Sequence, residues 1–518
     1  MLEAIAPGLP LARPQLRIRS WRTVAAGAAV VALVAVAAVL RLRALSAPYW
    51  IDEGISVGIA SHPLGAIPGV LREDGSPPLY YALLNVWIAL FGSAPSATHA
   101  LSAILAIACV PAAWWAVAPF GTWTGIAAAC VMAFDPYVGL YADETRMYSL
   151  VLLLALLACG AFLRAFVLRR RVHVATFALF AALALYTHAW GAFLVLGAVV
   201  AWVALIVVGP HRRAVARDGA IAFGAVAVLF APWVPTLLYQ SAHTAAPWSH
   251  RPTGTSLVRA LARMWSGRRA ELLLFPLAAV GLAVGLLRGG REVRRATLAA
   301  AVIAGVTLIA AFAYSRYGTP AWALRYLVVP LAPLALVVGL GLGRLAFIGP
   351  AVVILAALVT WHGRPTVATL DHKSNVAQVA HELGPALPRG TLVFSTQPEQ
   401  VPELAHELPA GMRFATPLGR VRDPGVMDWR DALTRLRAAR YDEALGARVH
   451  ALPAGARLLL VQPLFSHPDS PWTQKIREIA RHWGHALRHS TLLRRVRIVR
   501  PTHGDSRSTV EAVLLQRR

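Results

Sequence analysis

The chain has 518 residues, 57% of them hydrophobic, and a mean hydropathy of +0.57, which is too apolar for an ordinary soluble protein and typical of a polytopic membrane protein. The formal net charge of +25 would indicate a nucleic-acid partner on a soluble domain, but here the Arg residues stand in short clusters between apolar runs. Such clusters set membrane orientation, so we expect no nucleic-acid partner. Cys109, Cys130 and Cys159 lie in apolar stretches without CxxC spacing and predict packing residues, not disulfides or metal ligands.

Long apolar segments follow one another through the first two thirds of the chain, and most are long enough to span hydrocarbon. The first is not a cleaved signal peptide, because Arg41 and Arg43 follow it directly and no small-residue cleavage site does. The pattern predicts an all-α polytopic bundle of about eleven spans. The segments are 22–40, 97–118, 122–140, 148–168, 174–189, 191–208, 219–237, 271–288, 296–314, 322–341 and 345–361.

The Arg clusters predict the orientation of the spans. All of them fall on one side of the membrane if the N-terminus is cytoplasmic and the last span exits outward. The Arg residues of the 239–270 loop argue against this arrangement. The clusters are Arg13, Arg17, Arg19 and Arg22, then Arg164 and Arg169 to Arg171, then Arg212, Arg213 and Arg217, then Arg288, Arg291, Arg294 and Arg295; the opposing residues are Arg251, Arg259, Arg263, Arg268 and Arg269.

The segment 77–92, "PPLYYALLNVWIALFG", is apolar but short and begins with two prolines. Counting it as a span would invert the rest of the chain and put the Arg clusters outside. We therefore predict a helix packed at the outer membrane face, within one large loop over 41–96. This completes a transmembrane module over 1–363.

Beyond residue 364 the composition becomes more polar, and prolines and glycines punctuate it. Short apolar runs alternate with amphipathic stretches, which predicts a small α/β domain over 364–518, outside the membrane on the extracytoplasmic side. No Gly-rich phosphate loop, HExxH or metal cluster is found in it, so it is a packing or acceptor-presenting domain or a binding module. The apolar runs are 391–395, 412–416, 457–462 and 510–515, and the amphipathic stretches are 376–384, 399–407 and 428–440.

Two acidic turns stand at the ends of the predicted spans. Asp52 and Glu53 occur in "YWIDEGISVG" and are followed by "REDG" with Asp74, while Asp143 and Glu144 occur in "YADETRMYSL". The predicted orientation puts both turns on the outer face. Acids at the mouth of a helix bundle are costly near lipid and indicate a water-filled functional cavity.

These residue types suit the transfer of a group from a phosphate leaving group to a hydroxyl. One carboxylate can act as general base on an attacking hydroxyl, and Arg146 or Arg325 can neutralise a leaving phosphate. The alternatives are structural: Asp52 as the cap of a helix starting at Gly54, the second pair of acids as the cap of the span near Arg146, and Arg325 as an interfacial side chain.

Five fragments in order, "YWIDEGISV", "DGSPPLYYALLNVWIALFG", "YADETRMYSLVLLLAL", "ALYTHAWGAFLVLG" and "RYLVVPLAPLAL", resemble the GT-C membrane glycosyltransferases. Within that group the chain is similar to the dolichyl- or polyprenyl-phosphate-mannose protein mannosyltransferases of glycosyltransferase family 39. The resemblance implies an inverting transfer of a mannose-like sugar from a polyprenyl-phosphate donor to a hydroxyl at the outer face. The acceptor is a protein, a glycolipid or a polysaccharide.

The resemblance also implies roles for single residues. Asp52 takes the position of the catalytic base, and Glu144 that of the acid of the second loop. Asp143 stands where many relatives have Gln, which leaves open which of the two acids faces inward. The residues that the resemblance or the acidic turns assign to substrate binding are Glu53, Asp74, Tyr80, Asp143, Arg146, Tyr148, His188 and Arg325.

Three further expectations concern the setting. No cofactor is required, although paired acids can bind Mg²⁺ or Mn²⁺. The excess of Arg over Lys and the abundance of Ala suggest a high-GC bacterial genome, hence a plasma membrane facing a cell wall. The competing hypotheses are a transporter or flippase of a lipid-linked substrate, for which Asp135 in the 122–140 span is the best argument, and a non-catalytic scaffold.

Overall fold

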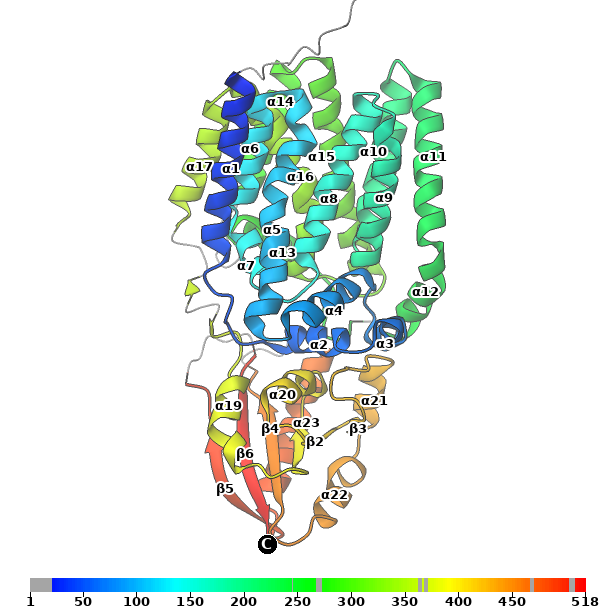
Figure 1. Cartoon of the computed structure of the whole chain (residues 1–518). Helices are drawn as coiled ribbons and strands as arrows, with labels where there is room; N and C mark the ends of the chain where they lie inside the picture. Colours follow the sequence, from blue (N-terminus) through cyan, green and yellow to red (C-terminus); the bar gives the residue numbers. More distant parts are fainter. Residues whose placement is uncertain are drawn as a thin grey trace, which may run out of the picture.

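The computed structural model describes residues 21–244, 246–266, 273–361, 366–367, 371–465, 470–502 and 508–518. A bundle of long helices forms one end of the molecule and a small sheet domain forms the other (Figure 1). The expected helical membrane bundle with a small α/β domain is confirmed. The N-terminal end of the first helix and the sheet domain lie at opposite ends of the bundle, as an odd number of crossings requires.

Each of the eleven apolar segments forms a helix or a bent pair of helices, and one further helix, α13, lies in the loop between two of these segments. The helices are α1 (Trp21–Arg41), α5 (Pro95–Val117), α6 (Thr122–Phe134), α7 (Pro136–Ala142), α8 (Tyr148–Phe162) continued by η3 (Leu163–Val167), α9 (Val172–Thr187), α10 (Gly191–Val208), α11 (Arg212–Phe230), α12 (Val234–His243), α13 (Gly254–Ser266), α14 (Leu274–Arg288), α15 (Arg291–Tyr317), α16 (Val328–Leu342) and α17 (Ile348–Val359).

Length separates these helices into two groups. Among the described residues, seven helical segments are long and apolar enough to cross a membrane, and α6 with α7 forms a further candidate that is bent by 55°. The helices α9, α14 and α17 are apolar but shorter. The count of eleven spans and the orientation therefore stay predictions. Residues 1–20 and 267–272, which include several of the Arg residues used to predict the orientation, lie outside the described residues.

The bend between α6 and α7 explains the acid inside the 122–140 segment. Asp135 is the N-cap of α7, and its Oδ1 accepts a hydrogen bond from the Tyr137 amide at 2.8 Å. Pro136 follows at the first helical position, where its missing N–H costs nothing. The acid thus has a structural role in starting α7.

Three short helices, α2 (Ile51–Ala60), α3 (Ile67–Asp74) and α4 (Leu79–Phe91), lie across the end of the bundle that faces the sheet domain (Figure 1). The 13 residues of α4 rise only about 20 Å, less than the ~30 Å of hydrocarbon in a bilayer. Gly75 ends α3 with a left-handed backbone, φ 99°, that favours glycine. These helices form a platform between the bundle and the sheet domain.

At the opposite end of the bundle, two of the Arg clusters meet around one buried acid. Asp218 lies 2.8 Å from Arg169, 3.2 Å from Arg217 and 3.5 Å from Arg171. The loop after α8 and the loop before α11 are thereby joined. This supports the placement of both clusters on a single side of the membrane.

The sheet domain has six strands in the order β3-β2-β1-β4-β6-β5. Strand β1 is parallel to both β2 and β4, and the remaining pairs are antiparallel. The domain begins after residues 362–365, which lie outside the described residues, so the boundary at 363 stays a prediction. Its elements are α19 (Val376–Leu383), β1 (Leu392–Ser395), α20 (Val401–Glu407), β2 (Arg413–Thr416), β3 (Gly419–Arg420), α21 (Ala432–Ala438), α22 (Ala447–His450), β4 (Arg457–Pro463), α23 (Pro471–Arg488), β5 (Leu493–Val499) and β6 (Val510–Arg517).

The sheet domain packs on α2 through two glycines one turn apart. A Cβ on Gly54 would lie 2.7 Å from the backbone of Glu403 at the start of α20, and a Cβ on Gly58 would lie 2.0 Å from the carbonyl oxygen of Gly425. Only glycine permits this approach. Because Asp52 and Glu53 precede these glycines on the same helix, the docking of the sheet domain fixes how the two acids are presented.

Candidate active site

A cavity of about 130 Å³ opens at the junction of the bundle, the short helices and the sheet domain. It receives side chains from the first turn of α2, the end of α3, the turn before α8, the loop after α12 and η5 (Leu324–Leu327). We call it the reaction pocket. Its lining residues are Asp52, Ile55, Asp74, Gly75, Ser76, Arg146, Thr244, Ala246, Trp248, Arg325, Tyr326 and Trp429.

Asp52 points into the reaction pocket and does not cap a helix. Helix α2 begins at Ile51 with Trp50 at the N-cap position, so Asp52 belongs to the first turn. Its Oδ2 lies 3.4 Å from a guanidinium nitrogen of Arg325, and its side chain is 17% exposed. The first turn of a helix favours a negative charge, so Asp52 is held as a partly exposed carboxylate facing a cation.

Arg146 joins the two acidic turns. Its Nη1 donates to the backbone oxygen of Asp52 at 3.2 Å and to Ser56 Oγ at 3.0 Å. Burial disfavours the charged form of Arg146, but Tyr81, Tyr148, Asp52 and Asp74 nearby outweigh it and raise the pKa of the guanidinium. The structure therefore brings the turn at 52–53 and the turn at 143–146 to one pocket.

Aromatic rings hold the second cation of the pocket. The Arg325 guanidinium lies over the ring of Trp248 at 4.6 Å and near the ring of Tyr326 at 5.7 Å. Trp429 of the sheet domain closes the pocket from the other side, and its amide donates to the Glu73 carbonyl at 3.0 Å. The pocket is thus built from both parts of the molecule.

Asp74 is the second carboxylate of the reaction pocket. Burial raises the pKa of Asp74, and a hydrogen bond from Ser76 acts in the opposite direction. Asp74 therefore keeps its proton to a higher pH than a solvent-exposed aspartate does. The pocket combines one carboxylate paired with Arg325 and one buried carboxylate whose pKa is raised above the usual value for aspartate.

Glu53 faces away from the reaction pocket into a closed buried network. Its Oε1 lies 2.5 Å from His99 Nε2 and accepts from the Thr145 amide at 2.8 Å, while its Oε2 accepts from Lys373 Nζ at 2.8 Å. Burial alone would raise the pKa of Glu53, but Lys373 and His99 outweigh it and hold the pKa at about 2. The predicted contact of Glu53 with substrate is not supported, because these partners enclose its carboxylate.

The same network holds the second acidic turn. Lys373 Nζ also donates to the backbone oxygen of Asp143 at 2.7 Å, and the Lys373 side chain is 1% exposed. Burial raises the pKa of the Asp143 carboxyl to about 7, although Lys373 acts to lower it. Asp143 and Glu144 do not line the reaction pocket, and the N-cap of α8 is Met147, so neither acid caps that helix.

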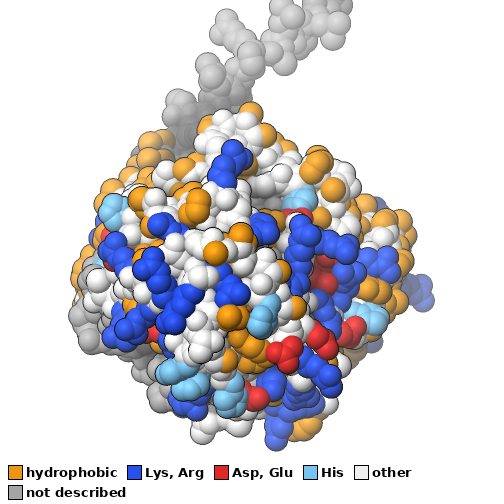
Figure 2. Space-filling model, turned by 90° about the horizontal axis from the view of Figure 1, so that it is seen from below, with side chains coloured by type: hydrophobic (Ala, Val, Ile, Leu, Met, Phe, Trp, Pro, Cys, Tyr) orange, Lys and Arg blue, Asp and Glu red, His pale blue; other side chains and the backbone are white. Residues whose placement is uncertain are grey.

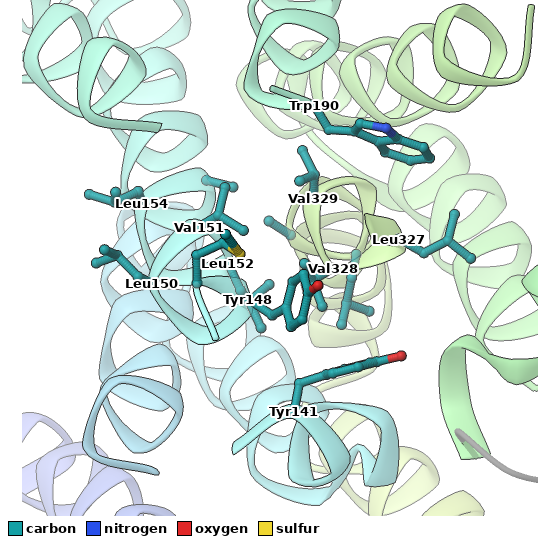
Figure 3. Packing of buried hydrophobic residues seen from close by; sticks show 14 of the residues in the cluster. Tyr141, Tyr148, Leu150, Val151, Leu152, Leu154, Trp190, Leu327, Val328 and Val329 are labelled. Carbon is teal, nitrogen blue, oxygen red and sulfur yellow. The ribbon is translucent and has the colours of Figure 1, made fainter. Parts of the chain in front are cut away.

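Four predicted site residues are buried next to the reaction pocket without lining it. Glu144 and Tyr80 have no exposed surface. Tyr148 packs between Tyr141 and the buried side chains of α16, with the two tyrosine rings 5.2 Å apart (Figure 3). His188 Nδ1 accepts from the Trp190 amide at 3.1 Å, and the His188 side chain is buried. These four residues therefore belong to the packed interior next to the pocket and not to its lining.

Sequence reasoning missed several residues of the site. Ser56, Trp248, Tyr326 and Trp429 contact the pocket or its arginines, and none of them stands in an acidic turn. Lys373 carried a signal that could have been used, because it is one of only two lysines among 50 basic residues. The sequence does not show, however, that Lys373 meets an acid 320 residues away.

The reaction pocket does not suit a resident divalent cation. Among the described residues, no group of three or more His, Cys, Asp and Glu side chains is close enough to hold a metal. The two carboxylates of the pocket, Asp52 and Asp74, share it with Arg146 and Arg325, which already supply positive charge. We therefore assign no metal to this site.

No family model and no curated protein matches the chain. Solved structures do match: ArnT from Cupriavidus metallidurans in the apo state has a TM-score of 0.61 at 14% identity, over 95% of this chain and 98% of that one. The same protein bound to undecaprenyl phosphate gives a TM-score of 0.56 at 14% identity, over 95% and 97%. The archaeal oligosaccharyltransferase AglB from Archaeoglobus fulgidus, in complex with an inhibitory peptide and a dolichol-phosphate, gives 0.52 at 11% identity, over 85% and 70%.

These similarities define the fold of the chain. It is the fold of the GT-C membrane glycosyltransferases, with a multi-pass helical bundle and a sheet domain at one end. At identities this low the likeness shows the fold alone, and the narrower resemblance to the protein mannosyltransferases stays a prediction.

Proposed function

We propose that the protein is an inverting glycosyltransferase that moves a sugar from a polyprenyl-phosphate carrier to a hydroxyl acceptor, with Asp52 as the general base. One observation carries this proposal: the Asp52 carboxylate faces the Arg325 guanidinium at 3.4 Å in a pocket at the end of a membrane bundle. A base beside a phosphate-binding cation is what transfer from a phosphate leaving group requires.

The reaction proceeds as a single displacement. The acceptor hydroxyl gives its proton to the Asp52 carboxylate, and its oxygen attacks the anomeric carbon from the face opposite the phosphate. The bond between that carbon and the phosphate oxygen breaks, and the electron pair leaves with the polyprenyl phosphate. Arg325 and Arg146 stabilise the charge of the leaving phosphate. The anomeric configuration inverts, because one displacement occurs.

The position of the reaction pocket suits a lipid-linked donor. The pocket lies where the bundle meets the short helices, so a polyprenyl tail can remain in the membrane while its phosphate reaches Arg325. The undecaprenyl phosphate bound to ArnT and the dolichol-phosphate bound to AglB support a polyprenyl-phosphate donor for this chain as well. The donor sugar is a mannose-like hexose or a pentose, and the acceptor belongs to a protein, a glycolipid or a polysaccharide.

The proposed setting is the plasma membrane, with the reaction pocket on the extracytoplasmic side. The Arg clusters at the end of the bundle remote from the pocket support this orientation. The transporter hypothesis loses its best argument, because Asp135 serves as the N-cap of α7. We do not extend a catalytic role to Glu144, which is fully buried outside the pocket lining.

Lipid analysis of cells tests the proposed activity. Mass spectrometry of lipid-linked sugars in cells lacking the protein should show an accumulated polyprenyl-phosphate monosaccharide, which identifies the donor. Complementation with the wild-type gene should remove the accumulated polyprenyl-phosphate monosaccharide, and complementation with the Asp52→Asn gene should not. Unchanged carrier pools in the deleted cells would refute the proposal.

A further inference from the structure

A second and larger cavity lies between the short helices and the sheet domain. It has a volume of about 760 Å³, within the range of ligand-binding clefts. We call it the interdomain groove. It is lined by His62, Ala66, Gly69, Val70, Glu73, Pro398, Val401, Thr416, Leu418, Gly419, Arg420, Val421, Arg422, Asp423, Val426, Met427, Asp428, Arg430 and Arg435.

The interdomain groove adjoins the reaction pocket. Glu73 lines the groove and its neighbour Asp74 lines the pocket; in the same way, Asp428 and Arg430 line the groove while Trp429 between them lines the pocket. The hydrogen bond from the Trp429 amide to the Glu73 carbonyl ties these two segments together. A chain bound in the groove would therefore lie next to the pocket.

The charges of the groove fall into two groups. Arg430 is paired with Asp428 at 2.8 Å and with Glu73 at 3.2 Å, and Arg435 is paired with Asp428 at 3.0 Å. The charges of these side chains therefore neutralise one another. They also fix donors and acceptors side by side, an arrangement that matches hydroxyl groups, which both donate and accept.

Two arginines of the groove are not compensated in this way. Arg420 and Arg422 are exposed, and no ion pair joins either of them to an acid among the described residues. The only further acid of the lining, Asp423, is paired with His62 at 2.7 Å. Within the described part of the chain, the groove thus presents two guanidinium groups that form no ion pair, and such groups bind phosphate or carboxylate groups well.

The end of the molecule formed by the sheet domain is rich in basic side chains. Seen from this end, the molecule shows more Lys and Arg side chains than acidic ones (Figure 2). A surface of one sign attracts a ligand of the opposite sign and raises the rate of encounter. An anionic acceptor approaching from this side would be guided towards the groove.

We propose that the interdomain groove binds the acceptor, and that this acceptor is a glycan carrying phosphate or carboxylate groups, held by Arg420 and Arg422. This rests on the proposed glycosyltransferase function and specifies its acceptor. A peptide acceptor fits the groove less well, because the sheet edge that lines it, β3, has two residues, too few to hold an extended peptide by main-chain hydrogen bonds.

Binding of defined glycans to the full-length protein in detergent tests this proposal. The probes are a phosphorylated mannose oligosaccharide, an oligogalacturonate and a neutral mannose oligosaccharide of equal length. Wild-type protein should bind at least one of the two anionic glycans about tenfold or more tightly than the neutral one. The anionic glycan that binds more tightly shows whether the natural acceptor carries phosphate or carboxylate groups. The double variant R420Q/R422Q should lose this preference. R437Q, which alters an exposed arginine of α21 outside the groove, should keep it.

Further outcomes separate this proposal from the proposed function. If R420Q/R422Q binds the anionic glycans as the wild type does while its Tm is unchanged, the groove proposal is overturned, whatever the activity. Tighter binding of an acidic peptide of matched charge than of either anionic glycan would also overturn it. The proposed function is tested by Asp52, which lies outside the groove, so either proposal can fail alone.

Discussion

Lys373 of the sheet-domain segment places its ammonium 2.8 Å from Glu53 Oε2 of α2, and both side chains are at most 1% exposed. The pair connects the first acidic turn with the chain that leads into the sheet domain. Because Glu53 also holds the Thr145 amide, and Lys373 also holds the Asp143 carbonyl, one buried pair fixes both acidic turns. The geometry of the reaction pocket depends on this pair without using it in the chemistry.

Removal of Lys373 should destabilise the protein strongly. The variant Lys373→Ala leaves the Glu53 carboxylate buried without its ammonium partner, which costs about 3–5 kcal/mol for a broken buried pair. We expect a large fall in Tm, measured by thermal unfolding in detergent.

The other lysine supplies the control. Lys475 forms an exposed pair with Glu478 one helical turn away, worth about 1 kcal/mol or less. Lys475→Ala should therefore leave Tm nearly unchanged. Equal Tm values for the two alanine variants would show that the buried pair does not hold the two parts together.

Asp143 should make stability depend on pH. Its pKa in the folded protein is raised from 3.8 to about 7, so its contribution is fully present below pH 3.8 and is lost as pH rises to about 7. The variant Asp143→Asn should remove this loss, and its Tm should exceed the wild-type value at pH 8 by a few degrees.

The exposed Asp442 provides the matched control for this experiment. Asp442→Asn should reproduce the wild-type dependence of Tm on pH between 4 and 8. The burial argument for Asp143 would be contradicted if both asparagine variants followed the wild-type curve.

A side chain at Gly58 should prevent the close packing of α2 against the sheet domain. In Gly58→Ala, the new Cβ would meet the Gly425 carbonyl at 2.0 Å, so the domain must shift and carry Trp429 away from the reaction pocket. We expect faster proteolysis between the two parts and reduced transfer. In Gly224→Ala on α11, the Cβ meets nothing within 4 Å, so this variant should behave as wild type. If both variants were equally active and protected, the docking argument would fail.

Arg325 should not be replaceable by lysine. The guanidinium stacks on Trp248 at 4.6 Å and faces Asp52 at 3.4 Å, and an ammonium cannot stack and bind a phosphate in the same planar way. Arg325→Lys should raise the KM for the lipid-linked donor tenfold or more. Arg344 at the other end of the same helical segment donates to the Phe120 carbonyl at 3.1 Å, and Arg344→Lys should leave that KM unchanged. A donor KM unaffected by Arg325→Lys would remove this arginine from the phosphate site.

The membrane helices could be predicted well from sequence, because a bilayer demands long apolar runs that leave a clear pattern. The central strands β1, β2, β4 and β6 could be predicted for the same kind of reason, since each is an apolar run. Strand β5 was missed because Arg494, Arg495 and Arg497 make it polar. An edge strand tolerates such charges, so its sequence does not differ from that of a loop.

The candidate site could be predicted only in outline. The sequence suggests that the two acidic turns meet, because they fall on one side of an alternating set of spans. It does not say which acid of each turn faces the pocket. Asp52 and Glu53 are adjacent on a helix and point in directions about 100° apart, so one faces Arg325 and the other Lys373. That division depends on partners hundreds of residues away, which no local pattern records.

The most direct test of the account is the turnover of purified Asp52→Asn protein with a polyprenyl-phosphate sugar and its acceptor. The amide keeps the size of the side chain but cannot accept the acceptor's proton, so the rate should fall by about 10²-fold or more while Tm and membrane insertion stay unchanged. A variant that transfers sugar at a near-normal rate would contradict the assignment of Asp52 as the base.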